Sequence, residues 1–177
     1  MNGNQVEQNP EALGNAWFVD GIEYVDSPDL EMAALDTINP GLYAVSGSIF
    51  ENILGTTTSP APGDTIFETS YAPNRLKYTS RSSKENIAVF SEIYFPWGWT
   101  ATVDGETVPI GRVDYVLRAI RVPAGNHQIE FTFDPQSLKA TNALAITSVV
   151  LIGLICLFAL GLWGKKLYGE ISAKKTS

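Results

Sequence analysis

Few side chains in this sequence are suited to catalysis, and they are widely spaced. His127 is the only histidine, so a serine triad or a histidine-ligated metal site would have to use it. It follows Gly125-Asn126 and begins a predicted strand, where an imidazole can hydrogen-bond a neighbouring turn. We therefore interpret His127 as structural. With no second histidine and only one cysteine, Cys156, we predict no metal and no cofactor.

Paired carboxylates offer another route to catalysis, because glycoside hydrolysis needs two carboxyl groups about 5–10 Å apart. Glu92, Asp104 and Asp114 flank predicted strands or lie in a predicted turn. Their spacing in the sequence does not show that they converge. A hydrolase acting through them is one hypothesis, which requires two of these side chains to face one cleft. We predict instead that this chain alone is not an enzyme.

Aromatic residues form the better candidate site. Sugar rings stack through their apolar C–H faces on exposed aromatic rings, while arginine donates hydrogen bonds to hydroxyls. Such residues gather around the turn 96–99 and on the strand that follows it. The predicted glycan contacts are Tyr94, Trp97, Tyr115 and Arg118.

Two structural interpretations of these residues stay open. Large aromatic side chains also fill cores, and Trp99, which alternates with Ala101 and Val103, is expected to do so. Arg118 stands in an apolar stretch, where it must extend to solvent or pair with an acid. Its partner would then be Asp114 or Glu92.

The elements that would position these residues are mostly short strands. Turn signals recur about every ten residues after residue 64, a spacing typical of all-β folds. Asp104-Gly105 favours a type I′ hairpin turn, because both central residues need positive φ. The pattern predicts a mainly β fold, an antiparallel β-sandwich of jelly-roll type. The strands are expected at 66–71, 75–81, 86–95, 99–103, 107–110, 113–122 and 127–133.

One short helix is predicted ahead of these strands, at residues 27–38. Ser27 can cap it, Pro28 suits its first position, and the residues 39–41, Asn-Pro-Gly, end it. Strands should flank it at 42–47 and at 16–26, the latter as one strand or as two joined at Asp20-Gly21. Apolar residues repeat along the helix and predict one buried stripe, made of Leu30, Ala34, Leu35 and Ile38.

Charge and composition divide the chain into parts. Residues 1–70 contain eleven acids and no lysine or arginine, and residues 71–142 are nearly balanced, so we expect no nucleic-acid partner. The predicted parts are an acidic α/β segment at 1–54, a loop or linker at 55–64, a β-sandwich domain at 65–135, a transmembrane helix at 143–164 and a basic tail at 165–177.

The uncharged run 143–163 predicts the transmembrane helix. Its twenty-one residues would rise about 31 Å as a helix, enough to cross a hydrocarbon core of about 30 Å. Four lysines and one acid follow it. The lipid bilayer is therefore an expected partner. Because positive residues are retained on the cytoplasmic side, we expect the tail to be cytoplasmic and residues 1–142 to lie outside a bacterial cell membrane.

The first fifteen residues have neither the basic nor the apolar region of a signal peptide. An outward domain of this size needs a preceding membrane segment for its export. We therefore expect the chain to be the C-terminal part of a longer protein, with the first ten residues as the remnant of a connection. Other transmembrane helices of that protein are then candidate partners.

The run SEIYFPWGWTATVDGETVPIGRVDYVLRAIRVPAGNHQIEFTFDP, residues 91–135, is followed directly by the membrane helix. Together with ALGNAWFV at residues 12–19, it resembles the C-terminal end of the YfhO-like bacterial membrane proteins. The resemblance implies a parent with many membrane helices and a glycosyltransferase-like architecture, associated with adding sugars to cell-envelope polymers. Catalytic acids of such enzymes lie far N-terminal to this region, so no catalytic residue is carried over.

Two functional hypotheses follow from these observations. The preferred one is a non-catalytic accessory domain, with the last membrane helix, of a YfhO-like protein involved in cell-envelope glycosylation. It would position an acceptor polymer or pack on the membrane core of its parent. The alternative is a stand-alone carbohydrate-binding or adhesion module tethered to the membrane. Either would take an envelope glycan as its partner.

Overall fold

The computed structural model describes residues 12–56 and 59–175, of which 136–140, 143 and 166–175 are described by their backbone alone. The predicted connection remnant at residues 1–10 lies outside this range. The lysine side chains after residue 165, on which the predicted membrane orientation rests, also lie outside what is described. The chain forms two compact units, Met1–Asp134 and Pro135–Ser177. The finer division at residues 55–64 stays a prediction.

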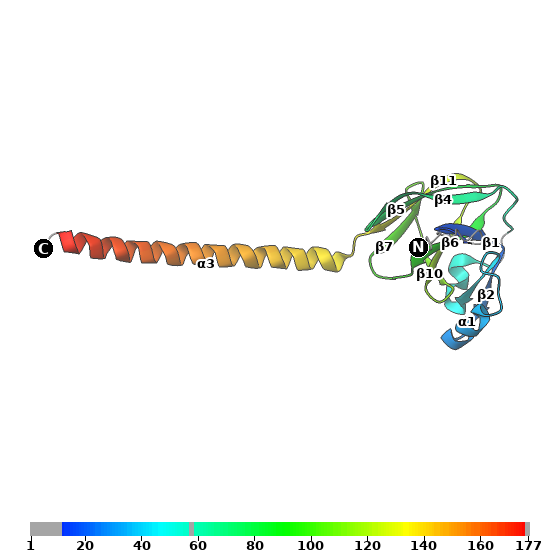
Figure 1. Ribbon diagram of the computed structural model, residues 1–177, viewed down its shortest axis with the longest axis horizontal. Coiled ribbons are helices and arrows are strands. Elements are labelled where there is room, and N and C mark those ends of the chain that lie inside the picture. The colour runs from blue at the N-terminus through cyan, green and yellow to red at the C-terminus, as the bar shows by residue number, and fades with distance from the viewer. Residues whose placement is uncertain (1–11, 57–58, 176–177) are drawn as a thin grey trace, which may run out of the picture. The chain divides into compact units, whose positions relative to one another are not determined.

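The first unit contains two antiparallel sheets, which confirms the predicted mainly β fold. Figure 1 shows β4, β5, β7 and β11 in one layer and β1, β6 and β10 in the other. The first sheet has the order β1-β6-β10-β9 and the second the order β4-β5-β11-β7-β8. The strands are β1 Ala16–Val19, β4 Thr65–Ala72, β5 Arg75–Ser82, β6 Asn86–Ile93, β7 Trp99–Val103, β8 Glu106–Val108, β9 Gly111–Val113, β10 Leu117–Val122 and β11 Gly125–Phe133.

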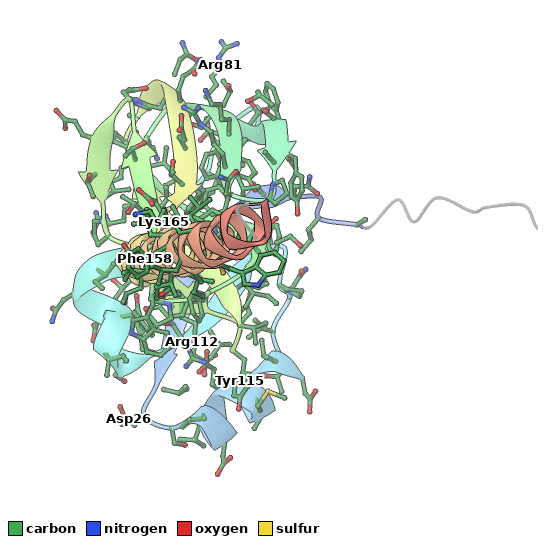
Figure 2. The ribbon with its side chains drawn as sticks, turned by 90° about the vertical axis from the view of Figure 1, so that its left-hand side faces the viewer. Asp26, Arg81, Arg112, Tyr115, Phe158 and Lys165 are labelled. Atoms are coloured by element: carbon green, nitrogen blue, oxygen red, sulfur yellow. The ribbon has the colours of Figure 1, made fainter. Side chains whose placement is uncertain are left out.

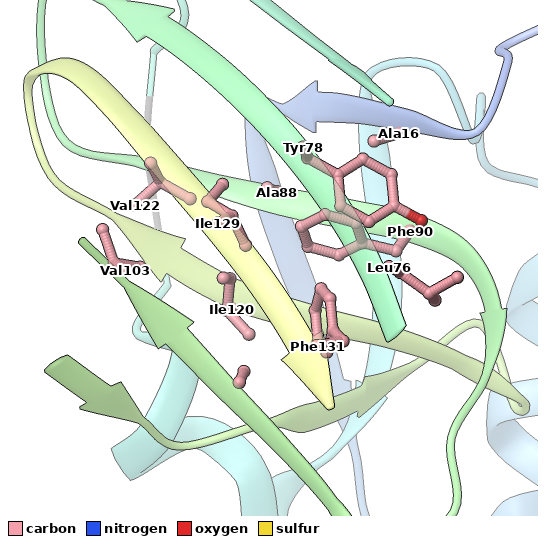
Figure 3. Close-up of a cluster of buried hydrophobic side chains, with 11 residues drawn as sticks. Ala16, Leu76, Tyr78, Ala88, Phe90, Val103, Ile120, Val122, Ile129 and Phe131 are labelled. Atoms are coloured by element: carbon pink, nitrogen blue, oxygen red, sulfur yellow. The ribbon is translucent and has the colours of Figure 1, made fainter. Parts of the chain in front are cut away.

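Strand β6 is buried on both faces. Ala88 and Phe90 enter the cluster between the two sheets, where Phe90 meets Phe131 edge-on at 4.8 Å between ring centroids (Figure 3). Ile87 and Val89 point the other way, into a second apolar cluster. Because successive side chains of a strand alternate between faces, β6 joins the two clusters.

The acidic N-terminal segment covers the second cluster. Strands β2 Gly21–Val25 and β3 Tyr43–Gly47 pair in parallel. Of the two possibilities for residues 16–26, the structure contains two strands, β1 and β2, joined at Asp20. Strand β1 pairs with β6, which places this segment in the same compact unit as the sandwich. The remaining elements are α1 Pro28–Leu35, the short 3₁₀ helix η1 Ser48–Phe50 and α2 Glu51–Leu54.

The predicted helix is present as α1, but its predicted buried stripe is wrong at Leu30, and Ala34, Leu35 and Ile38 are half-buried rather than buried. Ser27 caps the helix by accepting the Leu30 amide at 3.3 Å. Leu30 itself is 54% exposed, and the buried residue of α1 is Glu31, which is 1% exposed. Glu31 binds the Arg112 guanidinium at 2.7 Å, so a buried ion pair links this helix to β9.

The predicted strand 113–122 is also wrong, because the chain turns between β9 and β10. Asp114 and Tyr115 adopt positive φ angles of 48° and 68°. Asp114 is held there by two bonds to Val45: its amide donates to the Val45 carbonyl, and its carboxylate accepts the Val45 amide. The predicted hairpin turn is confirmed, with positive φ at both Asp104 and Gly105.

The second unit is the helix α3 Gln136–Lys175. Within it, Leu144–Lys165 forms a stretch of 22 residues with a mean hydropathy of 2.6. Among the described residues, this is the one helix long and apolar enough to cross a membrane. It contains the span predicted at 143–164 apart from its first residue, and Cys156 is exposed on its surface.

Candidate functional site

A surface groove of about 250 Å³ lies where the loop between β6 and β7 meets the β7–β8 hairpin. Gly98 has a φ of 107° and allows the chain to reverse between the two strands. The groove offers three aromatic rings, from Tyr94, Phe95 and Trp99. Two exposed threonines, Thr100 and Thr107, also line it. Its other lining residues are Pro96, Ala101, Val108, Pro109 and Ile110.

The predicted glycan contacts do not share one surface. Tyr94 is half-buried beside the groove, with its ring edge-on to Phe50 at 5.6 Å. Trp97 is 70% exposed but does not line the groove. Tyr115 lies in the β9–β10 turn, where the Arg112 guanidinium is 5.5 Å from its ring. Figure 2 labels both residues in the lower half of the first unit, far from Arg81 at its top.

Arg118 is buried under Trp99 rather than open to a ligand. It is 3% exposed, and its guanidinium lies 4.1 Å from the centre of the Trp99 ring. Its Nε donates to the Ile93 carbonyl at 2.9 Å, and its Nη2 lies 3.7 Å from the Glu92 carboxylate. Of the two predicted ion-pair partners, Glu92 is therefore the one found. Trp99 is half-buried and packs against the core between the sheets.

The three carboxylates of the hydrolase hypothesis bind different partners in the described part of the chain. Glu92 pairs with Arg118, and Asp114 holds the Val45 amide. Asp104 accepts His127 Nδ1 at 2.6 Å and the amide of Gln128 at 2.8 Å. No two of them share a hydrogen-bond or ion-pair partner among these bonds. This arrangement gives no support to a hydrolytic pair.

His127 binds two acceptors at once. Nδ1 faces the Asp104 carboxylate, and Nε2 lies 3.0 Å from the Ala124 carbonyl. Both ring nitrogens must donate to satisfy these acceptors, which requires the imidazolium. The hydrogen bond to Asp104, followed by the one to Ala124, raises the pKa of His127 above its ordinary value. Within residues 12–56 and 59–175, no three histidine, cysteine, aspartate or glutamate side chains gather as metal ligands.

Comparison with known proteins identifies the family. Residues 59–145 match the family described as "Bacterial membrane protein YfhO". The chain is a YfhO-like family member. It is also similar to "Uncharacterized protein YfhO" of Bacillus subtilis (strain 168), with 27% identity over 78 residues. That alignment covers 44% of this chain and 9% of the Bacillus protein. No solved structure matches the chain.

The family match defines which features belong to the YfhO-like region. It contains all five strands of the second sheet and the whole lining of the groove. Membership of a membrane protein family and the apolar helix together support association with a membrane. The match does not reach α1 or the strands β1, β2 and β3, which contribute Val19, Ile22 and Ala44 to the second apolar cluster.

The YfhO-like region meets this N-terminal segment through a buried polar cluster that the sequence pattern does not reveal. Glu31 accepts Arg112 Nη2 at 2.7 Å and the Tyr115 amide at 2.8 Å. Burial, the largest effect, and the nearby Glu31 charge raise the pKa of Asp114 to about 6. In the sequence, Glu31 resembles an ordinary solvent-exposed acid in the first turn of a helix, so its burial in this cluster could not be predicted. The cluster borders a pocket of about 270 Å³ that Asp26 and Ser48 also line.

Proposed function

We propose that this chain is the non-catalytic accessory domain, with the last membrane helix, of a YfhO-like protein that acts in cell-envelope glycosylation. The domain faces the outside of the bacterial membrane and holds an acceptor glycan in the groove beside Tyr94. The groove is the observation that supports the proposal, because aromatic rings and the exposed residues Thr100 and Thr107 line the same surface. Chemistry takes place in membrane segments that precede this region in the parent protein.

Aromatic rings and hydroxyls are the groups that bind sugars. The apolar face of a pyranose ring stacks on an aromatic side chain, and its hydroxyls exchange hydrogen bonds with threonine. Arg118 lies behind Trp99 and fixes the plane of that ring, since a guanidinium stacks face-on with an indole. Arg118 would thus act on the glycan through Trp99, without touching it.

Titration calorimetry tests this proposal on the full chain in lipid nanodiscs, with a panel of envelope polysaccharides and their short oligosaccharides. We expect at least one glycan to bind and Tyr94→Ala to weaken its binding about tenfold, equivalent to about 1.4 kcal/mol. Tyr71→Ala is the matched control, since Tyr71 is exposed on β4 and does not line the groove. Absence of heat with every glycan, or an equal loss in both variants, would refute glycan binding in the groove.

The alternative function is a stand-alone membrane-tethered carbohydrate-binding or adhesion module. It shares the glycan prediction, so calorimetry does not separate it from the accessory domain. The genomic context separates the two functions: a multi-span membrane region fused to this segment, or encoded beside it, supports the accessory role. A complete gene with no such region would support the stand-alone module.

A further inference from the structure

The loop between β6 and β7 carries an apolar pair on its surface. Phe95 is 44% exposed and Trp97 is 70% exposed, and their rings meet edge-on with centroids 5.2 Å apart. The whole segment from Ile93 to Val103 contains no charged residue. Water-exposed aromatic pairs without neighbouring charges mark a surface that contacts another apolar phase or partner.

This pair is attached to the last residues of the first unit. The Phe95 ring lies 6.4 Å from the ring of Phe133, the final residue of β11. The Asp134 amide donates to the Gly98 carbonyl at 2.9 Å, which ties the loop to the residue that ends the unit. The exposed aromatic rings therefore stand at the end of the sandwich from which the chain continues into α3.

The covalent chain keeps that end close to the bilayer. Ten residues after Asp134, the apolar stretch begins at Leu144. The one linking residue, Pro135, and the eight helical residues 136–143 span at most about 20 Å between Asp134 and Leu144. Beyond the hydrocarbon core, the headgroup region itself extends about 5–8 Å on each side. The bilayer surface is thus the one apolar phase that the chain itself brings within reach of Phe95 and Trp97.

We propose that Phe95 and Trp97 insert into the headgroup region of the membrane that holds α3, as a second anchor for the domain. Tryptophan favours this region because its ring is apolar and its N–H group remains hydrated. An uncharged loop meets no cost of desolvating a charge there. Trp97 then contacts lipid, whereas the glycan occupies the adjacent groove, which Phe95 borders and Trp97 does not line.

Quenching of tryptophan fluorescence by lipids with brominated acyl chains tests this anchor on the full chain. The chain has four tryptophans, and Trp163→Phe removes the one inside the membrane span. In this background, brominated lipid should quench part of the emission, and Trp97→Phe should remove the quenched part. Trp17 and Trp99 remain in both proteins as half-buried references. Two results together would overturn the anchor: lipid quenching that Trp97→Phe leaves unchanged, and quenching of the Trp97 emission by aqueous iodide in the Trp163→Phe background.

A displaced tryptophan provides the matched control. Arg81 is exposed at the other end of the second sheet, opposite Asn126 on β11, about 23 Å along the strand from Phe133. In the protein with Trp163→Phe and Trp97→Phe, Arg81→Trp should be quenched by iodide and not by brominated lipid. Equal lipid quenching at positions 81 and 97 would show general adsorption of the domain and would also contradict the proposal.

The two sites separate in these experiments. Tyr94→Ala should weaken glycan binding and leave lipid quenching unchanged. Trp97→Phe should remove the lipid-quenched emission and leave glycan binding unchanged. If Trp97→Phe instead abolishes glycan binding and leaves lipid quenching unchanged, Trp97 is a glycan contact and the membrane anchor is refuted.

Discussion

The amide of Asp134 donates a hydrogen bond to the carbonyl of Gly98, at 2.9 Å. This bond joins the loop that carries the groove and the exposed aromatic pair to the end of strand β11. Beyond Asp134 the chain enters the helix that contains the membrane span. The loop is therefore held at the end of β11, where the Phe95 ring also lies 6.4 Å from the Phe133 ring.

Arg118→Lys should destabilise the first unit by about 2 kcal/mol, although it conserves charge. Lysine loses both the planar stacking on Trp99 and the Nε bond to the Ile93 carbonyl. Urea unfolding followed by circular dichroism measures the change. Arg121→Lys is the control, since Arg121 forms an exposed ion pair with Glu85, and it should change stability by less than about 0.5 kcal/mol. Equal effects would contradict a special role for Arg118.

Asp114→Asn should stabilise the chain at pH 7. Burial raises the pKa of Asp114 from 3.8 to about 6, so its stabilising contribution is complete below pH 3.8 and is lost as the pH rises through about 6. Asparagine tolerates the same positive φ and still accepts the Val45 amide. We expect a gain of about 1 kcal/mol at pH 7, because water screens part of the charge, and no gain at pH 4.

The urea midpoints of Asp114→Asn and of the parent chain, measured at both pH values, test this. A variant that is less stable at pH 7 would mean that the ionised carboxylate stabilises the β9–β10 turn.

The single histidine should titrate above its ordinary pKa of 6.5. The bonds to Asp104 and to the Ala124 carbonyl both favour the imidazolium, so its stabilising contribution is present below pH 6.5 and is lost as the pH rises through the raised pKa. Because a tag-free chain has one histidine, NMR resolves its imidazole signals without mutagenesis. Asp104→Asn should lower the midpoint towards 6.5, and a midpoint that this change leaves in place would contradict the pairing.

Gly111→Ala should cost about 1–3 kcal/mol of stability, because the new methyl group overfills the second apolar cluster. A Cβ at this position would lie 2.5 Å from Cδ1 of the buried Leu54. Gly47→Ala is the matched control on another strand, since its Cβ would meet only Ile49 Cγ1 at 3.9 Å. Thermal unfolding of the two variants should give a clearly lower midpoint for Gly111→Ala, and coincident midpoints would show that Leu54 moves aside freely.

Local chemistry in the sequence determined the elements that depend on nearest neighbours. Asp104-Gly105 was sufficient to predict the hairpin between β7 and β8, because few other residues accept two successive positive φ angles. The uncharged run before Trp163 predicted the membrane helix, since length and hydropathy alone decide whether a helix can span a bilayer. Resemblance in residues 91–135 pointed to the family that the comparison found.

Only the tertiary structure decided which residues meet across the chain. The turn at Asp114-Tyr115 depends on Val45, and the burial of Glu31 depends on Arg112, 81 residues away in sequence. The tertiary structure also decided that Tyr94 lines the groove and that the more exposed Trp97 does not. Short-range patterns determine strands, turns and the membrane helix because the backbone responds to adjacent residues. Long-range pairs are selected by the packing of the whole unit, which no local pattern contains.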